Sequence, residues 1–219
     1  MDLDFILEHT PMYITAAWLV LRIAAIGILL SLLLGLACSL IQYYKIPVLK
    51  TVTSGYIELS RNTPLLVQLF FLYFGLPKLG IVISSEACAI IGLTFLGGSY
   101  MAEAFRSGLE SVEKGQIEAG LSVGLEHSQI LRYVVLPQAI SVSVPALCAN
   151  FIFLIKETSV FSAVALADLM YVAKDLIGLY YKTDESLLLL VISYLVILLP
   201  ISVIASIIER KLCYVGFGY

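Results

Sequence analysis

A short polar run follows one of the most apolar stretches of the chain and carries groups capable of binding chemistry. Glu157, Thr158 and Ser159 come just after the stretch "NFIFLI", which starts at Asn150. A carboxylate accepts hydrogen bonds from an ammonium group, whereas hydroxyl and amide groups donate them to a carboxylate. The four side chains together therefore offer what a small zwitterion needs. The alternative is an interfacial polar turn that only ends a helix.

Charged residues also occur inside or at the ends of other apolar segments, where they are costly and are therefore functional candidates. Glu103 and Arg106 are three residues apart and can pair on one helix face. This pair fits either a helix end that supports the following loop or the lining of an inner pathway or gate. Arg22 lies within the first apolar segment, where we expect it to reach the interface or to pair with a carboxylate.

The residues needed for intramembrane catalysis are missing from the apolar segments. Both histidines, His9 and His127, lie outside them, and the segments contain no Asp. A Ser/His pair, two aspartates or an HExxH motif therefore cannot form there, and we predict no catalytic and no metal-binding residue. The chain also has no GxxxxGK[ST] phosphate loop. We expect that it is not an enzyme and that any ATP-driven work requires another chain.

The elements that carry these residues are predicted to be membrane-spanning helices. Of 219 residues, 60% are hydrophobic and 13% are charged, whereas soluble domains have about 25% charged residues. A helix of about 20 apolar residues crosses a bilayer. We therefore predict an all-α, polytopic membrane protein with a single domain over 1–219 and a core from about 14 to 209. Five transmembrane helices are expected, at roughly Ile14–Ile41, Pro64–Leu76, Ile81–Phe105, Val134–Ile155 and Ser186–Ile208.

Basic residues in the connections predict the orientation, because cytoplasmic loops are enriched in Lys and Arg. One side holds eight of them: Lys45, Lys50, Arg61, Arg106, Lys114, Arg132, Arg210 and Lys211. The other side holds four: Lys78, Lys156, Lys174 and Lys182. The N-terminus is therefore predicted outside and the C-terminus in the cytoplasm of a lipid-embedded cell-membrane protein. Nothing in the sequence indicates nucleic-acid binding.

The predicted cytoplasmic connection of about 107–136 has the pattern of one or two short helices. Ile117, Leu121 and Leu125 recur every four residues as an apolar stripe, and Gly120 and Gly124 form an adjacent strip. Because glycine costs about 1 kcal/mol relative to alanine in a helix, two on one face indicate close approach to another backbone. That backbone belongs either to a neighbouring helix of this chain or to a cleft on another protein.

This connection resembles the EAA loop of ABC importer permeases, which reads E-A-A, three residues, G, nine residues, I-x-L-P. The chain has "EAG" at 118–120, Gly124 and "VVLP" at 134–137, with the same spacing, so Gly replaces Ala once and Val replaces Ile once. Three further segments resemble the polar amino acid permease subfamily: "GYIELSRNTPLLVQLFFLYFGLP" (55–77), "GGSYMAEAFRSGLESVEKGQIEA" (97–119) and "FIFLIKETSVFSAV" (151–164).

The resemblance implies half of the membrane part of a type I importer, whose EAA loop forms a cytoplasmic coupling helix docked on an ATPase dimer. It also implies a second permease, identical or a paralogue, and an extracytoplasmic substrate-binding protein. ATP and Mg are expected in the partner ATPase, with no cofactor in this chain. The residues expected to make the ATPase contact are Glu118, Ala119, Gly120, Leu121, Gly124 and Leu125.

The same resemblance implies a role in the substrate pathway for the polar run after the fourth predicted span. "KETS" at 156–159 resembles the subfamily's K-[DEN]-T-S, which implies that the zwitterion in question is a polar amino acid. The candidate residues of the substrate pathway are Glu157, Thr158, Ser159, Asn150 and Glu103.

A second subfamily motif is expected to be structural. "RNTP" at 61–64 resembles R-[GN]-T-P. Asn62 or Thr63 is predicted to cap the next helix, with Pro64 in its first turn, and Arg61 fits the basic inner side.

Two other functions stay open on the sequence alone. One is an importer for another small polar solute, such as an opine-like compound or an amino acid derivative. The other is a stand-alone channel or secondary carrier, which predicts transport without a partner ATPase and leaves the loop motif unexplained.

Overall fold

The computed structural model describes residues 1–216, with side chains up to Leu212, and all regular structure in this part is helical. The predicted all-α class is thus confirmed for the described residues. In chain order the elements are α1 (Leu3–Tyr43), α2 (Leu49–Arg61), α3 (Leu65–Phe70), η1 (Phe71–Gly75), η2 (Leu76–Leu79), α4 (Ser85–Glu110), α5 (Lys114–Ser122), α6 (His127–Ile130), η3 (Leu131–Val135), α7 (Leu136–Glu157), η4 (Thr158–Val164), α8 (Leu169–Tyr180) and α9 (Thr183–Gly216).

Four helical stretches of the described chain are long and apolar enough to cross a membrane. They are Leu3–Tyr43, Ser85–Glu110, His127–Val164 and Thr183–Leu212. These stretches account for four of the five predicted spans. The remaining prediction falls on Leu65–Leu79, an apolar helix that is shorter than the stretch of about 20 residues needed for a crossing.

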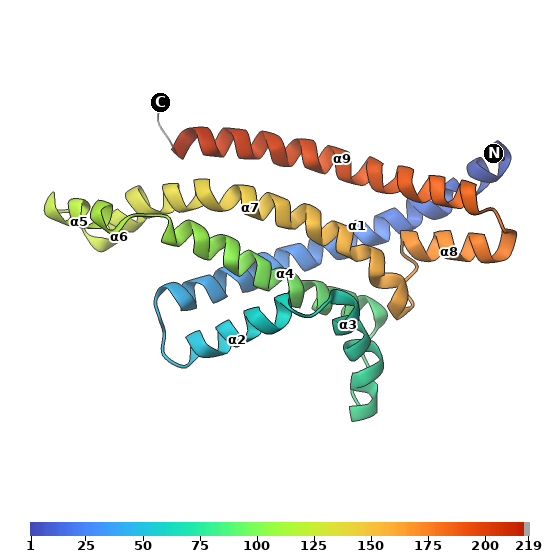
Figure 1. Cartoon of the computed structure of the whole chain (residues 1–219), viewed down its shortest axis with the longest axis horizontal. Coiled ribbons are helices and arrows are strands. Elements are labelled where there is room, and N and C mark those ends of the chain that lie inside the picture. Colours follow the sequence, from blue (N-terminus) through green and yellow to red (C-terminus); the bar gives the residue numbers. More distant parts are fainter. Residues whose placement is uncertain (217–219) are drawn as a thin grey trace.

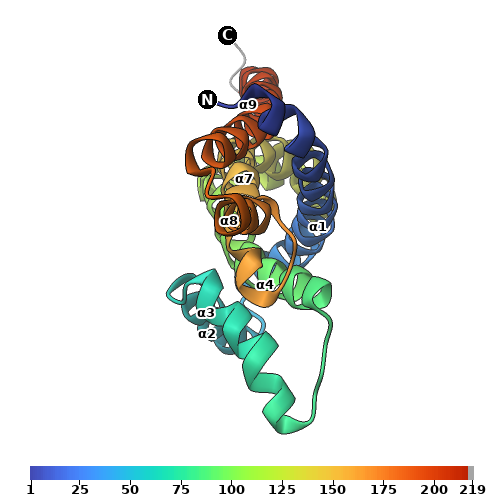
Figure 2. The same cartoon turned by 90° about the vertical axis from the view of Figure 1, so that its right-hand side faces the viewer.

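The four long helices lie side by side along the long axis of the molecule (Figures 1 and 2). Glycines allow α1 and α4 to approach closely. A Cβ atom on Gly27 would lie 2.7 Å from Leu93 Cδ2, and one on Gly97 would collide with Ser31 of α1 and Leu154 of α7. Small residues at helix contacts are the usual means of tight packing in membranes. The α1–α4–α7 core therefore depends on residues that have no side chain.

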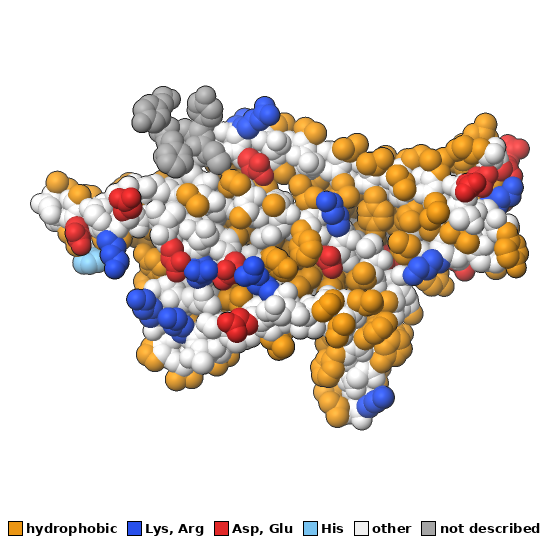
Figure 3. All heavy atoms as spheres, viewed as in Figure 1, with side chains coloured by type: hydrophobic (Ala, Val, Ile, Leu, Met, Phe, Trp, Pro, Cys, Tyr) orange, Lys and Arg blue, Asp and Glu red, His pale blue; other side chains and the backbone are white. Residues whose placement is uncertain are grey.

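The arm, which we define as residues 65–79 (α3, η1 and η2), turns away from this bundle near the middle of its length (Figures 1 and 2). Its three phenylalanine side chains are exposed, with relative exposures of 45% for Phe70, 61% for Phe71 and 53% for Phe74, whereas Tyr73 is partly buried. Hydrophobic side chains cover most of its visible surface (Figure 3). The preceding helix, α2, doubles back beside α4 and brings its polar residues next to those of α4.

Candidate functional site

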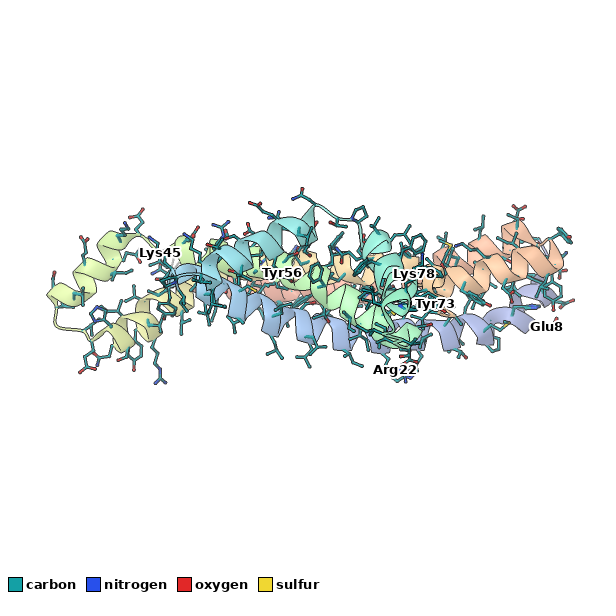
Figure 4. The ribbon with its side chains drawn as sticks, turned by 90° about the horizontal axis from the view of Figure 1, so that it is seen from below. Glu8, Arg22, Lys45, Tyr56, Tyr73 and Lys78 are labelled. Atoms are coloured by element: carbon teal, nitrogen blue, oxygen red, sulfur yellow. The ribbon has the colours of Figure 1, made fainter. Side chains whose placement is uncertain are left out.

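A polar cavity of about 670 Å³ lies between α2 and the second half of α4. Figure 3 shows acidic and basic side chains gathered over these two helices, and Figure 4 shows Lys45 at the turn that leads into α2. Four basic and three acidic side chains are among the residues that line the cavity: Gln42, Lys45, Lys50, Ser54, Ile57, Glu58, Arg61, Asn62, Tyr100, Glu103, Arg106 and Glu110.

Glu103 is the centre of the ion-pair network in this cavity. Its Oε1 accepts from Arg106 Nε at 3.2 Å and its Oε2 accepts from Arg106 Nη2 at 2.8 Å, which confirms the predicted pair on one helix. Arg106 Nη1 also donates to Glu110 Oε2 at 2.7 Å. Arg61 joins from α2, with Nη1 3.3 Å from Glu103 Oε2 and its guanidinium carbon 5.4 Å from the centre of the Tyr100 ring. The network thus links α2 to α4.

A second cavity, of about 330 Å³, contains Glu157. It is lined by 61–66 together with Leu96, Tyr100, Phe153, Glu157 and Val160. Arg61, Asn62 and Tyr100 line both cavities. The structure therefore places Glu157 and Glu103 in two adjacent cavities, with the guanidinium of Arg61 at their common wall.

The other predicted pathway residues do not join Glu157 in this conformation. Thr158 is fully buried and its hydroxyl donates to the carbonyl of Ile155 at 2.6 Å. Asn150 Nδ2 donates to the carbonyl of Tyr100 at 3.2 Å and so ties α7 to α4. Neither these residues nor Ser159 line the two cavities. The four-residue zwitterion site expected from the sequence is not assembled here, because successive residues of a helix point in different directions.

Asp168 fixes the chain that follows Glu157. It is 1% exposed and caps α8, with Oδ1 accepting from the amide of Tyr171 at 2.7 Å and Oδ2 from the amide of Ser162 at 3.0 Å. Burial raises the pKa of Asp168 to about 6, although these amides and the nearby Lys174 ammonium act in the opposite direction. The carboxylate thereby holds η4 against the start of α8.

The predicted cytoplasmic connection forms two short helices, α5 and α6, at the end of the bundle opposite α8 (Figure 1). Glu118, Ala119 and Leu121 of α5 are exposed, whereas Ile117 and Leu125 are partly buried against a cluster that includes residues of α4 and α7. The helix therefore has one face fastened to its own chain and one free face.

The local structure explains the glycine at position 120 and the glycine at position 124 in different ways. The amide of Leu125 donates to the carbonyl of Gly120 at 3.1 Å, and that of Gly124 donates to Leu121 at 3.0 Å, which is the Schellman pattern of a helix C-terminus. Gly124 has φ +87°, a conformation that glycine adopts readily. A Cβ on Gly120 would lie 3.0 Å from Ile130 Cγ1. The prediction that both lie on one helix face is wrong for Gly124, because α5 has ended.

Two further sequence predictions have clear outcomes. Arg22 pairs with Glu86 through a 2.6 Å contact, which confirms the expected carboxylate partner; in Figure 4 it points away from α2. The prediction that Asn62 or Thr63 caps the next helix is wrong. Asn62 Nδ2 donates to the carbonyl of Glu58, and Thr63 Oγ1 donates to that of Leu59, so both finish α2 instead.

Arg61 is the site residue that sequence reasoning missed. Its position at a helix end among other basic residues favoured a purely structural role. Only the fold brings α2 next to α4 and so places Arg61 against Glu103 and Tyr100. A guanidinium four residues before an apolar helix carries no such signal by itself.

Comparison with known proteins agrees with the architecture. Residues 27–213 match the family described as "Binding-protein-dependent transport system inner membrane component". The chain is 38% identical over 180 residues to the probable glutamine ABC transporter permease protein GlnP of Bacillus subtilis (strain 168), covering 80% of this chain and 83% of that protein. It is 30% identical over 215 residues to the arginine transport system permease protein ArtQ of the same organism, covering 97% and 98%.

A solved structure agrees over almost the whole length. The match to a chain of "Crystal structure of an amino acid ABC transporter with histidines" has a TM-score of 0.89 and 34% identity, and covers 96% of this chain and 99% of that one. The family assignment, the four long apolar helices and this fold together indicate a multi-pass membrane protein. The chain belongs to the family of binding-protein-dependent transport system inner membrane components, the permease subunits of ABC transporters.

Proposed function

We propose that this permease subunit forms the transmembrane pathway of an ATP-driven importer for a polar amino acid. The observation that carries the proposal is the pair of adjacent cavities beside α4 of an apolar helix bundle, whose walls contain both carboxylates and guanidinium groups. An amino acid zwitterion needs one group of each sign. The relatives named for glutamine and arginine agree in substrate class.

The membrane arrangement belongs to the same proposal. The four long helices supply four crossings, and the short apolar segment at about Pro64–Leu76, extended by flanking residues, supplies the fifth, with the N-terminus outside and the C-terminus in the cytoplasm. This orientation is supported by the eight-to-four distribution of basic residues. The single domain extends over the whole chain, from 1 to 219, and the coupling loop lies on the cytoplasmic side.

ATP binding and hydrolysis are coupled to the permease through α5. The exposed side chains of Glu118, Ala119 and Leu121 are the contact with a cytoplasmic ATPase dimer, and the turn at Gly124 sets the angle at which the chain returns to α6. ATP and Mg bind to the ATPase. A second permease, either identical or a paralogue, completes the pathway, and an extracytoplasmic binding protein delivers the substrate. Nucleotide-driven closure then switches the helices between two packed arrangements.

The substrate contact assigned to this chain is Glu157, which accepts hydrogen bonds from the substrate ammonium. Glu103 lies further along the same pathway and is already paired. Asn150, Thr158 and Ser159 take part only if switching rotates their side chains into the cavity. Another small polar solute is the alternative cargo, since the two cavities contain groups of both signs.

Reconstitution tests the proposal. Proteoliposomes that contain the permease, its ATPase and its binding protein are expected to accumulate an amino acid only with ATP. Uptake should be abolished by Gly124→Asp and strongly reduced by Glu157→Gln, the latter with assembly and basal ATPase activity largely intact. Uptake without the ATPase, or uptake unaffected by Gly124→Asp, would identify a stand-alone channel or carrier instead. Loss of assembly in Glu157→Gln would assign that residue to structure.

A further inference from the structure

Arg61 is held less firmly than the other guanidinium in the network. Arg106 makes three hydrogen bonds, of 2.7 to 3.2 Å, to Glu103 and Glu110, which lie on its own helix. Arg61 has one ion-pair contact in the network, at 3.3 Å, and that contact crosses from α2 to α4. A guanidinium has five N–H donors, so Arg61 keeps most of its donors available for another anion.

The negative charge of Glu103 remains paired when Arg61 leaves the network. Glu103 retains both hydrogen bonds from Arg106, at 3.2 and 2.8 Å. The ring of Tyr100 lies beneath the Arg61 guanidinium and also lines both cavities. Cation–π attraction to this ring does not require the Glu103 contact, so it can hold the guanidinium during an exchange of partners.

Arg61 also shares a cavity with Glu157. The two side chains line the same space of about 330 Å³, whose other lining residues are the polar Asn62 and Thr63 and the apolar or aromatic Pro64, Leu65, Leu66, Leu96, Tyr100, Phe153 and Val160. One cationic group and one carboxylate in one small cavity match the two ends of a zwitterion. The planar guanidinium fork suits a carboxylate, which it can bind through two parallel hydrogen bonds.

We propose that Arg61 is the carboxylate-recognising residue of the pathway and that it exchanges Glu103 for the α-carboxylate of the transported amino acid. This inference rests on the proposed function and names a specificity residue within it. The ligand class is α-amino acids with a free carboxylate. Substrate binding therefore breaks the Arg61–Glu103 ion pair between α2 and α4, while the Tyr100 ring of α4 still holds the guanidinium.

The test measures binding in the absence of the binding protein, which would otherwise impose its own selectivity. The purified permease–ATPase complex in detergent is titrated with radiolabelled L-glutamine and L-arginine and, separately, with the two carboxamides that lack the free carboxylate. Arg61→Gln is expected to weaken binding of the acids about tenfold or more, as loss of a charge-assisted hydrogen bond does. Binding of the carboxamides should stay unchanged.

Three variants make the result specific. Arg61→Lys keeps the charge but not the fork, and is expected to recover part of the loss. Glu103→Gln weakens the competing partner and is expected to tighten binding of the acids several-fold. Arg22→Gln removes a guanidinium that pairs with Glu86 outside both cavities, and serves as the matched control with wild-type affinity.

The outcomes distinguish failure of the Arg61 proposal from failure of the proposed importer function. Equal weakening of acids and carboxamides in Arg61→Gln, unchanged binding of the acids, or no saturable binding to the wild-type complex would each overturn the exchange. ATP-driven uptake by the wild-type system is measured in parallel. If uptake is present and the Arg61 variants do not discriminate, only the inference fails; if uptake of amino acids is absent, the proposed function fails.

Discussion

Position 124 can require glycine for one of two reasons: the positive φ of the turn, or a close contact that leaves no space for a side chain. Substitutions at this position distinguish the two reasons. A Cβ added at Gly124 meets no atom within 4 Å, so steric exclusion inside this chain is not the reason for the glycine. Its φ of +87° is the reason, and an L-residue held in the left-handed region costs roughly 1–2 kcal/mol. For a helix as short as α5, which has nine residues, that cost changes the population of the ordered turn about 5- to 30-fold.

We therefore expect Gly124→Ala to loosen the end of α5 and to reduce ATP-driven uptake by a similar factor. Gly124→Asn should be less damaging than Gly124→Ala, since Asn enters this backbone region more readily than Ala and, unlike Gly124→Asp, brings no charge to the loop. Gly120→Ala should be close to neutral. Its Cβ would lie 3.0 Å from Cγ1 of the buried Ile130, and the resulting overpacking of about 1 kcal/mol offsets the roughly 1 kcal/mol of helix propensity that alanine gains.

The assay combines hydrogen exchange of the amides in 114–126 with uptake into proteoliposomes. From Gly120→Ala through Gly124→Asn to Gly124→Ala, the rate of amide exchange should increase and the rate of uptake should decrease. If Gly124→Asn abolishes uptake while its exchange stays at the wild-type level, the bare surface of the glycine is itself a docking contact, and the conformational reasoning is refuted.

The other predictions concern packing, titration and a surface pair. Gly108→Ala should lower the thermal unfolding midpoint by several degrees through overpacking of about 1–3 kcal/mol against Ser143 and the backbone of α7, whereas Gly55→Ala, with open space around it, should not. Asp168 is protonated more readily in the folded state than in the unfolded state, so stability should fall by up to about 3 kcal/mol as pH rises from about 4 to about 6; Asp168→Asn should flatten this dependence in thermal melts at several pH values. Arg22→Gln should lower the free energy of unfolding by at most about 1 kcal/mol, because the side chains of the Arg22–Glu86 pair are about half exposed; the same melts at low and high salt measure this. A flat wild-type pH profile, or equal midpoints for the two glycine variants, would contradict the first two of these expectations.

The sequence predicted most strongly what depends on local composition. Long apolar runs with few charges predicted four long helices, and the three-residue spacing of Glu103 and Arg106 predicted their pair, since both signals are local in the sequence. The short run at 65–79 was harder to assign, because its apolar length is below that of a span and only the fold turns it out of the bundle.

The candidate site was less predictable, because it depends on which helices become neighbours. The hydroxyl, amide and carboxylate groups near 150–159 were grouped by their closeness in sequence, yet only Glu157 lines a cavity. Its cavity partner, Arg61, is almost a hundred positions earlier and on another helix. A Schellman turn, in contrast, was readable in principle: a glycine two residues beyond the end of a helical pattern is its ordinary signature.

The loop that contains α5 and α6, which we propose as the coupling loop, and the ion-pair network are joined by one helix, α4. Leu109 at the end of α4 and Val112 just after it pack in one apolar cluster with Ile130, Val135 and residues of the loop. A packed cluster transmits a displacement because its neighbours cannot be compressed. Movement of α5 therefore reaches the last turns of α4, which also carry the carboxylates of the network. Loosening this cluster by Ile130→Ala should accordingly lower uptake more than it lowers ATP hydrolysis, a difference that simultaneous measurement of both rates detects; an equal fall in the two rates would mean that the loop acts only on the ATPase and not on the pathway.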